Sequence, residues 1–195
     1  MRAWFTKLYL ALSGWQIVGQ VPEGGKAVVV AAPHTSNWDF LYLYLLSQTL
    51  GIQIRWMGKE ELFKGVVGHF SRRLGGIPVK RSRSMNLVAQ MVQAFEQREQ
   101  LLLVVPPAAT RRKTDYWKSG FYHIARGADV PVVLGFVDYG RKRAGFGPSF
   151  KLTGDVRADM DRIRAFYADI QGKFPAQKSV IRLKVEDEER SGGFG

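Results

Sequence analysis

Residues 27–39 read AVVVAAPHTSNWD, and the interpretation of the whole chain starts from this stretch. The apolar run at 27–32 contains three consecutive valines, which is typical of a strand buried on both faces, and Pro33 ends it. A helix is expected to follow at once, with Ser36 or Asn37 as its N-cap, because short polar side chains accept the unpaired amides of a first turn. A buried strand that leads directly into a helix indicates a β-α unit of a parallel sheet.

Apolar strands and amphipathic helices alternate along the remaining chain. Strands are expected at 27–32, 52–57, 77–79, 101–105, 131–137 and 149–153. Helices are expected at 36–50, 59–74 (interrupted by glycines), 84–95, 117–126 and 155–172. The sequence therefore predicts one α/β domain at 21–185, with a mostly parallel sheet flanked by helices. Residues 1–20 predict an N-terminal amphipathic helix, and residues 186–195 a disordered tail.

The composition excludes several classes of protein. The 195 residues include 29 Lys and Arg against 17 Asp and Glu, a formal net charge of +12, which predicts an anionic partner. The chain has no cysteine, so it has no disulfide framework, thiolate nucleophile or sulfur-ligated zinc site. No apolar run approaches the roughly 20 residues of a membrane-spanning helix. We expect no metal site and no nucleic-acid partner, since neither ligand spacing nor a nucleic-acid module is present.

The N-terminal segment carries an apolar stripe. Trp4, Leu8, Leu12 and Trp15 recur at three- and four-residue steps, with Lys7 as a nearby charge. Two interpretations remain open. The helix packs on the core of the domain, or it lies in a membrane interface with its aromatic side chains at headgroup depth, and both can hold if the stripe is only partly covered.

His34 and Asp39 are the sharpest chemical signal in the sequence. Side chains five residues apart on one helix point about 140° away from each other. His34 precedes the helix, however, so a bend can bring the Asp39 carboxylate to the imidazole, fix its tautomer and leave the other ring nitrogen as a base. The alternative is an ordinary loop histidine beside an aspartate that interacts with the helix dipole.

Four stretches together resemble the glycerolipid acyltransferase family. His34 and Asp39 match its His-x4-Asp motif. The segments GGIPVKR at 75–81, PAATR at 107–111 and VPVV at 130–133 resemble its second, third and fourth blocks, in the family's order. The resemblance extends over about residues 28–137 and implies the fold of a glycerol-3-phosphate acyltransferase.

The resemblance implies a reaction and a site. His34 would be the general base, oriented by Asp39, that takes a proton from the hydroxyl of a lysophospholipid such as lysophosphatidate. The acyl donor would be a thioester, acyl-CoA or acyl carrier protein, with no other cofactor. The residues implied in substrate binding are Gly76, Arg81, Thr110 and Arg111. The enzyme would sit peripherally on the cytoplasmic side of an anionic membrane, where the acceptor is found.

Ala108 and Ala109 depart from the family pattern, which has glutamate and glycine at these positions. Alanine cannot accept the hydrogen bonds of a carboxylate, and Ala109 would strain a backbone that glycine allows at positive φ. Loss of one charged hydrogen bond corresponds to roughly 1.5–3 kcal/mol. The sequence therefore predicts an acyltransferase of weakened activity, with a lipid-binding protein on the same fold as the alternative.

Overall fold

The computed structural model describes residues 2–79 and 84–187, which form seven strands and six α-helices with two short 3-10 helices. The strands are β1 (Gln16–Val18), β2 (Lys26–Ala31), β3 (Ile54–Lys59), β4 (Gly76–Val79), β5 (Leu101–Val105), β6 (Val132–Asp138) and β7 (Arg143–Phe150). The helices are α1 (Arg2–Ser13), α2 (Asp39–Leu50), η1 (Glu60–Phe63), α3 (Gly65–Arg73), α4 (Ser84–Glu96), α5 (Gly120–Gly127), α6 (Val156–Tyr167) and η2 (Pro175–Gln177).

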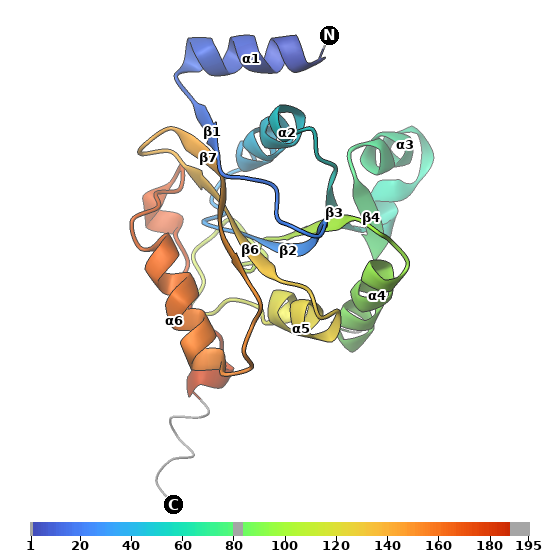
Figure 1. Cartoon of the computed structure of the whole chain (residues 1–195), viewed down its shortest axis with the longest axis vertical. Helices are drawn as coiled ribbons and strands as arrows, with labels where there is room; N and C mark the ends of the chain where they lie inside the picture. Colours follow the sequence, from blue (N-terminus) through green and yellow to red (C-terminus); the bar gives the residue numbers. More distant parts are fainter. Residues whose placement is uncertain (1, 80–83, 188–195) are drawn as a thin grey trace, which may run out of the picture.

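All seven strands lie in one sheet, in the order β1-β7-β6-β2-β5-β3-β4 (Figure 1). Every neighbouring pair is parallel except β6 and β7, which form an antiparallel hairpin. The predicted α/β domain with a mostly parallel sheet is therefore confirmed. The central strand β2 is bonded on both sides, by β5 and by β6, which explains its continuous run of valines.

The two faces of the sheet carry separate hydrophobic cores. Alternate residues of β2 point to opposite faces, so Val28 and Val30 join the larger core and Val29 the smaller one. Helices α4, α5 and α6 cover the larger core, and α2 covers the smaller one. Helix α1 packs on α2, and α3 lies at the β3-β4 edge of the sheet.

The N-terminal segment differs from the helix expected at 1–20. Helix α1 ends at Ser13, and Gly14 has a left-handed φ of 71° that a side chain would strain. Residues 16–18 form β1, which is the edge strand of the sheet and pairs with β7, an arrangement that only the tertiary fold provides. Trp15 is buried and stacks on Tyr42 of α2 at 3.7 Å between ring centroids, so it leaves the apolar stripe of α1.

Strand β7 begins six residues earlier than the strand expected at 149–153. The sequence pattern did not predict the first part of β7, because it contains glycines at 145 and 147 and glycine is unfavourable inside strands. Gly145 is required here by close approach: a Cβ atom at this position would collide with the carbonyl group of Val18 on β1.

Helix boundaries differ in smaller ways. Neither Ser36 nor Asn37 is the N-cap of α2, which begins at Asp39 without a side-chain cap. The helix expected at 59–74, with interruptions at Gly65 and Gly68, is broken into η1 and α3 at Gly65, but Gly68 lies within α3 and does not interrupt it. Helix α5 begins later than expected, and α6 ends five residues early.

The prediction of a disordered tail at 186–195 is wrong at its first residue. The buried Glu186 accepts hydrogen bonds from the amide of Leu183 at 2.7 Å and from Arg164 at 2.8 Å. Glu186 therefore packs on the domain, while residues 188–195 lie outside the described part of the chain.

Candidate active site

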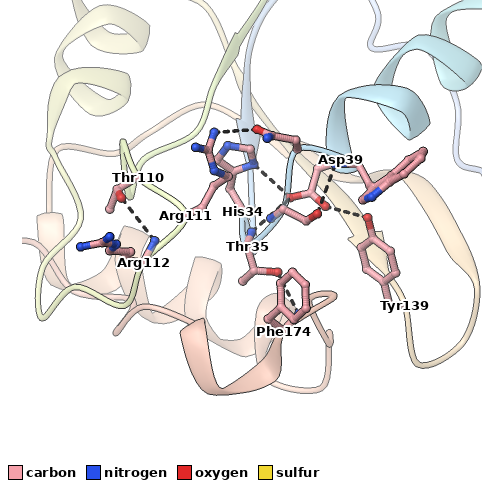
Figure 2. A network of polar contacts seen from close by, with 11 residues as sticks. His34, Thr35, Asp39, Thr110, Arg111, Arg112, Tyr139 and Phe174 are labelled. Atoms are coloured by element: carbon pink, nitrogen blue, oxygen red, sulfur yellow. Dashed lines mark hydrogen bonds and ion pairs between the residues drawn. The ribbon is translucent and has the colours of Figure 1, made fainter.

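The candidate site lies at the carboxyl ends of three adjacent parallel strands. His34 follows β2, Thr110 and Arg111 follow β5, and Tyr139 follows β6 (Figure 2). Loops at this edge of an open parallel sheet are a common location of ligand sites. Asp39, at the first position of α2, lies at the centre of this group (Figure 2).

Asp39 receives four hydrogen bonds, so its carboxylate is held in one orientation. Its Oδ2 accepts from the amides of Thr35 and Ser36, both at 3.1 Å, and lies 3.0 Å from Nδ1 of His34. Because an ionised carboxylate only accepts, Nδ1 carries the hydrogen and Nε2 is left as the basic nitrogen. The bend that the sequence predicted between His34 and Asp39 is present, and the two backbone amides explain why the chain turns tightly there.

Tyr139 donates the fourth hydrogen bond, at 2.9 Å to Oδ1 of Asp39, and the sequence analysis missed it. Burial, followed by the hydrogen bond to Asp39, raises the pKa of Tyr139 well above its usual value, so the phenol stays protonated and donates. Its ring packs edge-on against Trp15 and Tyr42. The available signal was its position one residue beyond a buried strand, but its partner is 100 residues away in sequence.

Arg111 lies beside the His34–Asp39 pair and is oriented by a second residue that the sequence analysis missed. Its Nη1 donates to Oδ1 of Asn37 at 2.6 Å, which fixes one edge of the guanidinium group. Thr110 accepts a hydrogen bond from the amide of Arg112 at 3.2 Å, which shapes the loop, and Thr110 also lines the cavity beside His34.

The two other residues implied in substrate binding are placed differently. Gly76 is buried in β4 and does not line the cavity beside His34; a Cβ atom there would lie 2.7 Å from the Phe63 ring and 2.8 Å from the carbonyl oxygen of Ser71. Its role in this structure is close packing of β4 against η1 and α3. Arg81 lies outside the described residues.

Ala109 has a φ of 55°, in the left-handed region that glycine occupies without strain. The strain predicted at this position is therefore present. Ala108 is buried at 8% exposure, among the larger core, and shares with His34 and Lys178 the lining of a cavity of about 10 Å³.

A cavity of about 970 Å³ opens beside His34 and Asp39. This volume is at the upper end of the range of about 300–1,000 Å³ for small-molecule sites. Most of its lining is apolar, from β2, α2, β3, α4, β5, α5, β6 and β7, and its polar lining includes Arg111, Lys118 and His123.

Over residues 2–79 and 84–187, no cluster of three or more His, Asp or Glu side chains is arranged to hold a metal ion. Within the same ranges, no helix has the length and apolarity needed to cross a membrane.

Comparison with known proteins identifies the family. The acyltransferase family profile matches residues 16–134, more than half of the chain, and the chain therefore belongs to the acyltransferase family. Among solved structures, the chain is similar to the 1-acyl-sn-glycerophosphate (LPA) acyltransferase PlsC of Thermotoga maritima, with a TM-score of 0.55 and 16% identity over 99% of this chain and 79% of that chain. This likeness confirms the fold. No curated protein matches the sequence.

Proposed function

We propose that the protein transfers a fatty acyl chain from an acyl thioester to the hydroxyl group of a lysophospholipid such as lysophosphatidate. The observation that carries the proposal is the His34–Asp39 pair at a large apolar cavity, in a chain of the acyltransferase family. In this reaction the basic Nε2 of His34 takes the hydroxyl proton while the oxygen attacks the thioester carbonyl. A C–O bond forms, the C–S bond breaks, and the thiolate leaves with the proton from the imidazolium.

Asp39 supports this step through Nδ1. Its carboxylate stabilises the imidazolium that forms, and the two amides and Tyr139 hold that carboxylate in place. The acyl chain would occupy the apolar cavity, whose lining excludes water from the thioester. Either acyl-CoA or an acylated acyl carrier protein could be the donor, since each presents the acyl chain as a thioester.

Arg111 is proposed to bind a phosphate group on the acceptor. A guanidinium group forms paired hydrogen bonds to phosphate oxygens, and the contact with Asn37 orients it before the substrate arrives. Arg81 is proposed as a second ligand of the same phosphate, on the family resemblance alone. Of the other two implied residues, Gly76 would act by allowing β4 to pack closely, and Thr110 by shaping the loop that carries Arg111.

A membrane location fits the surface of α1. Trp4 and Leu12 are 62% and 80% exposed, and Phe5, Leu8 and Tyr9 are also exposed. Aromatic side chains beside Lys7 suit the interface of an anionic bilayer. We propose peripheral attachment on the cytoplasmic side, where anionic lipid would attract a chain of net charge +12.

A lipid-binding protein without turnover is the second candidate, and Ala108 and Ala109 favour it. Position 109 keeps the left-handed backbone that the family's glycine suits, but neither alanine supplies a carboxylate.

The test compares acyl transfer by three chains. The donor is acyl-CoA or acylated acyl carrier protein with a labelled acyl group, and the acceptors are a panel of lysolipids. The three chains are the present chain, its Ala108→Glu/Ala109→Gly variant, and that variant with His34→Ala. The proposal expects transfer in the second chain, weak transfer in the first and none in the third. If no chain transfers acyl groups from either donor, while lipid still binds, the lipid-binding candidate replaces the enzyme.

A further inference from the structure

Helix α3 presents its large apolar side chains outward. Val66, Phe70 and the C-cap residue Leu74 recur at every fourth residue, and with Val67 they form one face of the helix, here named the α3 apolar face. Val66 is 76% exposed, Val67 63% and Phe70 59%. A surface helix normally turns such residues toward the core, so a contiguous apolar face of this kind indicates an interaction surface.

The side of α3 that packs on the domain consists of small residues. Gly68 and Ser71 are its buried positions, and a Cβ atom at Gly68 would collide with the carbonyl group of Phe63. The backbone of α3 therefore approaches η1 too closely for a valine or phenylalanine side chain to fit at position 68. Small residues occupy the buried side of α3, and its large apolar residues lie on the exposed side.

Charge on and around the face indicates its partner. Within α3 the charged residues are Arg72 and Arg73, both exposed, and Lys64 directly precedes the helix. The acidic pair Glu60 and Glu61 lies in η1, one turn earlier. Exposed apolar side chains flanked by arginine and lysine suit the interface of an anionic bilayer, where the side chains enter the acyl boundary and the cations meet headgroups.

The position of α3 agrees with this partner. Figure 1 shows α1, α2 and α3 on the same side of the sheet, so a flat lipid surface on that side could meet α1 and α3 together. Aromatic contacts also link the η1-α3 segment to the cavity. Phe63 packs on Trp56, with ring centroids 5.9 Å apart, and Trp56 packs on Phe40 at 6.2 Å. Both Trp56 and Phe40 line the cavity beside His34.

We propose that the α3 apolar face is a lipid-contact surface that, separately from α1, docks the domain on an anionic bilayer beside the cavity. The relevance of this contact to lysolipid delivery rests on the proposed function. The contact itself is measurable without catalysis, so the two proposals can fail separately.

The experiment measures partition of the full chain onto vesicles of phosphatidylcholine and phosphatidylglycerol, and of phosphatidylcholine alone. Val66→Ser/Val67→Ser is compared with Val180→Ser/Val185→Ser, which changes two exposed valines elsewhere on the surface. We expect the α3 pair to reduce partition about tenfold and the control pair to leave it unchanged, since each valine would bury part of its surface in lipid. Higher salt should weaken binding to the anionic vesicles.

A second measurement uses the absence of cysteine. Phe70→Cys and, separately, Val180→Cys can each be labelled with one environment-sensitive dye, and we expect vesicles to shift the emission to the blue only at position 70. Equal partition of the two valine pairs, or no emission change at position 70, would overturn the proposal. So would self-association in the absence of lipid that Val66→Ser/Val67→Ser abolishes, because a second copy would then cover the face. If partition behaves as expected but no chain transfers acyl groups, the enzyme proposal fails and the lipid contact stands.

Discussion

Tyr139→Phe tests how the carboxylate of the candidate site is held. The substitution removes one hydroxyl group, which donates at 2.9 Å to Oδ1 of Asp39. The phenylalanine ring retains the edge-on contacts with Trp15 and Tyr42. The bonds from His34 and from the two backbone amides to Oδ2 also remain, so the variant isolates the Oδ1 contact.

The expected magnitude follows from the chemistry of that contact. A hydrogen bond to a charged group contributes roughly 1.5–3 kcal/mol, and Asp39 is only 8% exposed. If the whole contribution is made in the transition state, kcat falls about tenfold to a hundredfold. We expect the lower end, because Oδ2 keeps its three partners. KM should change little, since Tyr139 acts through Asp39 and is assigned no substrate contact.

The assay measures kcat and KM in whichever chain is active, together with the free energy of unfolding. Tyr122→Phe is a matched control, because Tyr122 donates a similar buried hydrogen bond, 2.7 Å long, to Asp159 away from the cavity. Both variants should lose stability, and only Tyr139→Phe should lose kcat. Equal kcat in parent and Tyr139→Phe, or an equal fall in both variants, would refute the assigned role of Tyr139.

Three further outcomes are expected. Ala109→Gly should raise the free energy of unfolding by about 1 kcal/mol, because glycine occupies a φ of 55° without strain; an unchanged urea midpoint would contradict this. Asn37→Ala should raise KM several-fold for a phosphorylated acceptor but not for an unphosphorylated one, because Arg111 loses its 2.6 Å contact; equal changes for both acceptors would count against a phosphate role. Asp159 is desolvated by burial, but hydrogen bonds led by the amide of Thr153 outweigh this effect and lower its pKa below the usual 3.8. Its contribution to stability is therefore full above about pH 4 and is lost as the pH falls further, so Asp159→Asn should flatten the fall of the thermal midpoint in acid; a fall as steep as in the parent would exclude Asp159 as its source.

Local chemistry was enough to predict the class of fold and the central pair of the site. The run at 27–32 could only be buried between neighbours, and the helical periodicity of 87–95 specified a helix whatever surrounded it. The contact between His34 and Asp39 could also be predicted from the sequence, because the two residues are only five positions apart. Two backbone amides of the turn between them donate to the Asp39 carboxylate and hold it near His34. The backbone strain at Ala109 could be predicted because alanine stands where the family pattern has glycine.

Contacts between segments far apart in the chain could not be predicted from local sequence patterns. Strand β1 forms because β7 offers an open edge, and nothing within residues 16–18 distinguishes that strand from a continuation of α1. Tyr139 reaches Asp39 only because β6 lies next to β2 in the sheet.

The sequence alone determined the alternation of elements, the positive charge and the chemistry offered at His34 and Asp39, because these depend on residue type and on spacing within one or two turns. The tertiary structure alone decided which fourth partner completes the Asp39 carboxylate, and which apolar side chains remain outside on α1 and α3. The physical reason is the same in each case. Hydrogen bonds and burial depend on distance in space, and for segments far apart along the chain the packing of the sheet and helices sets that distance.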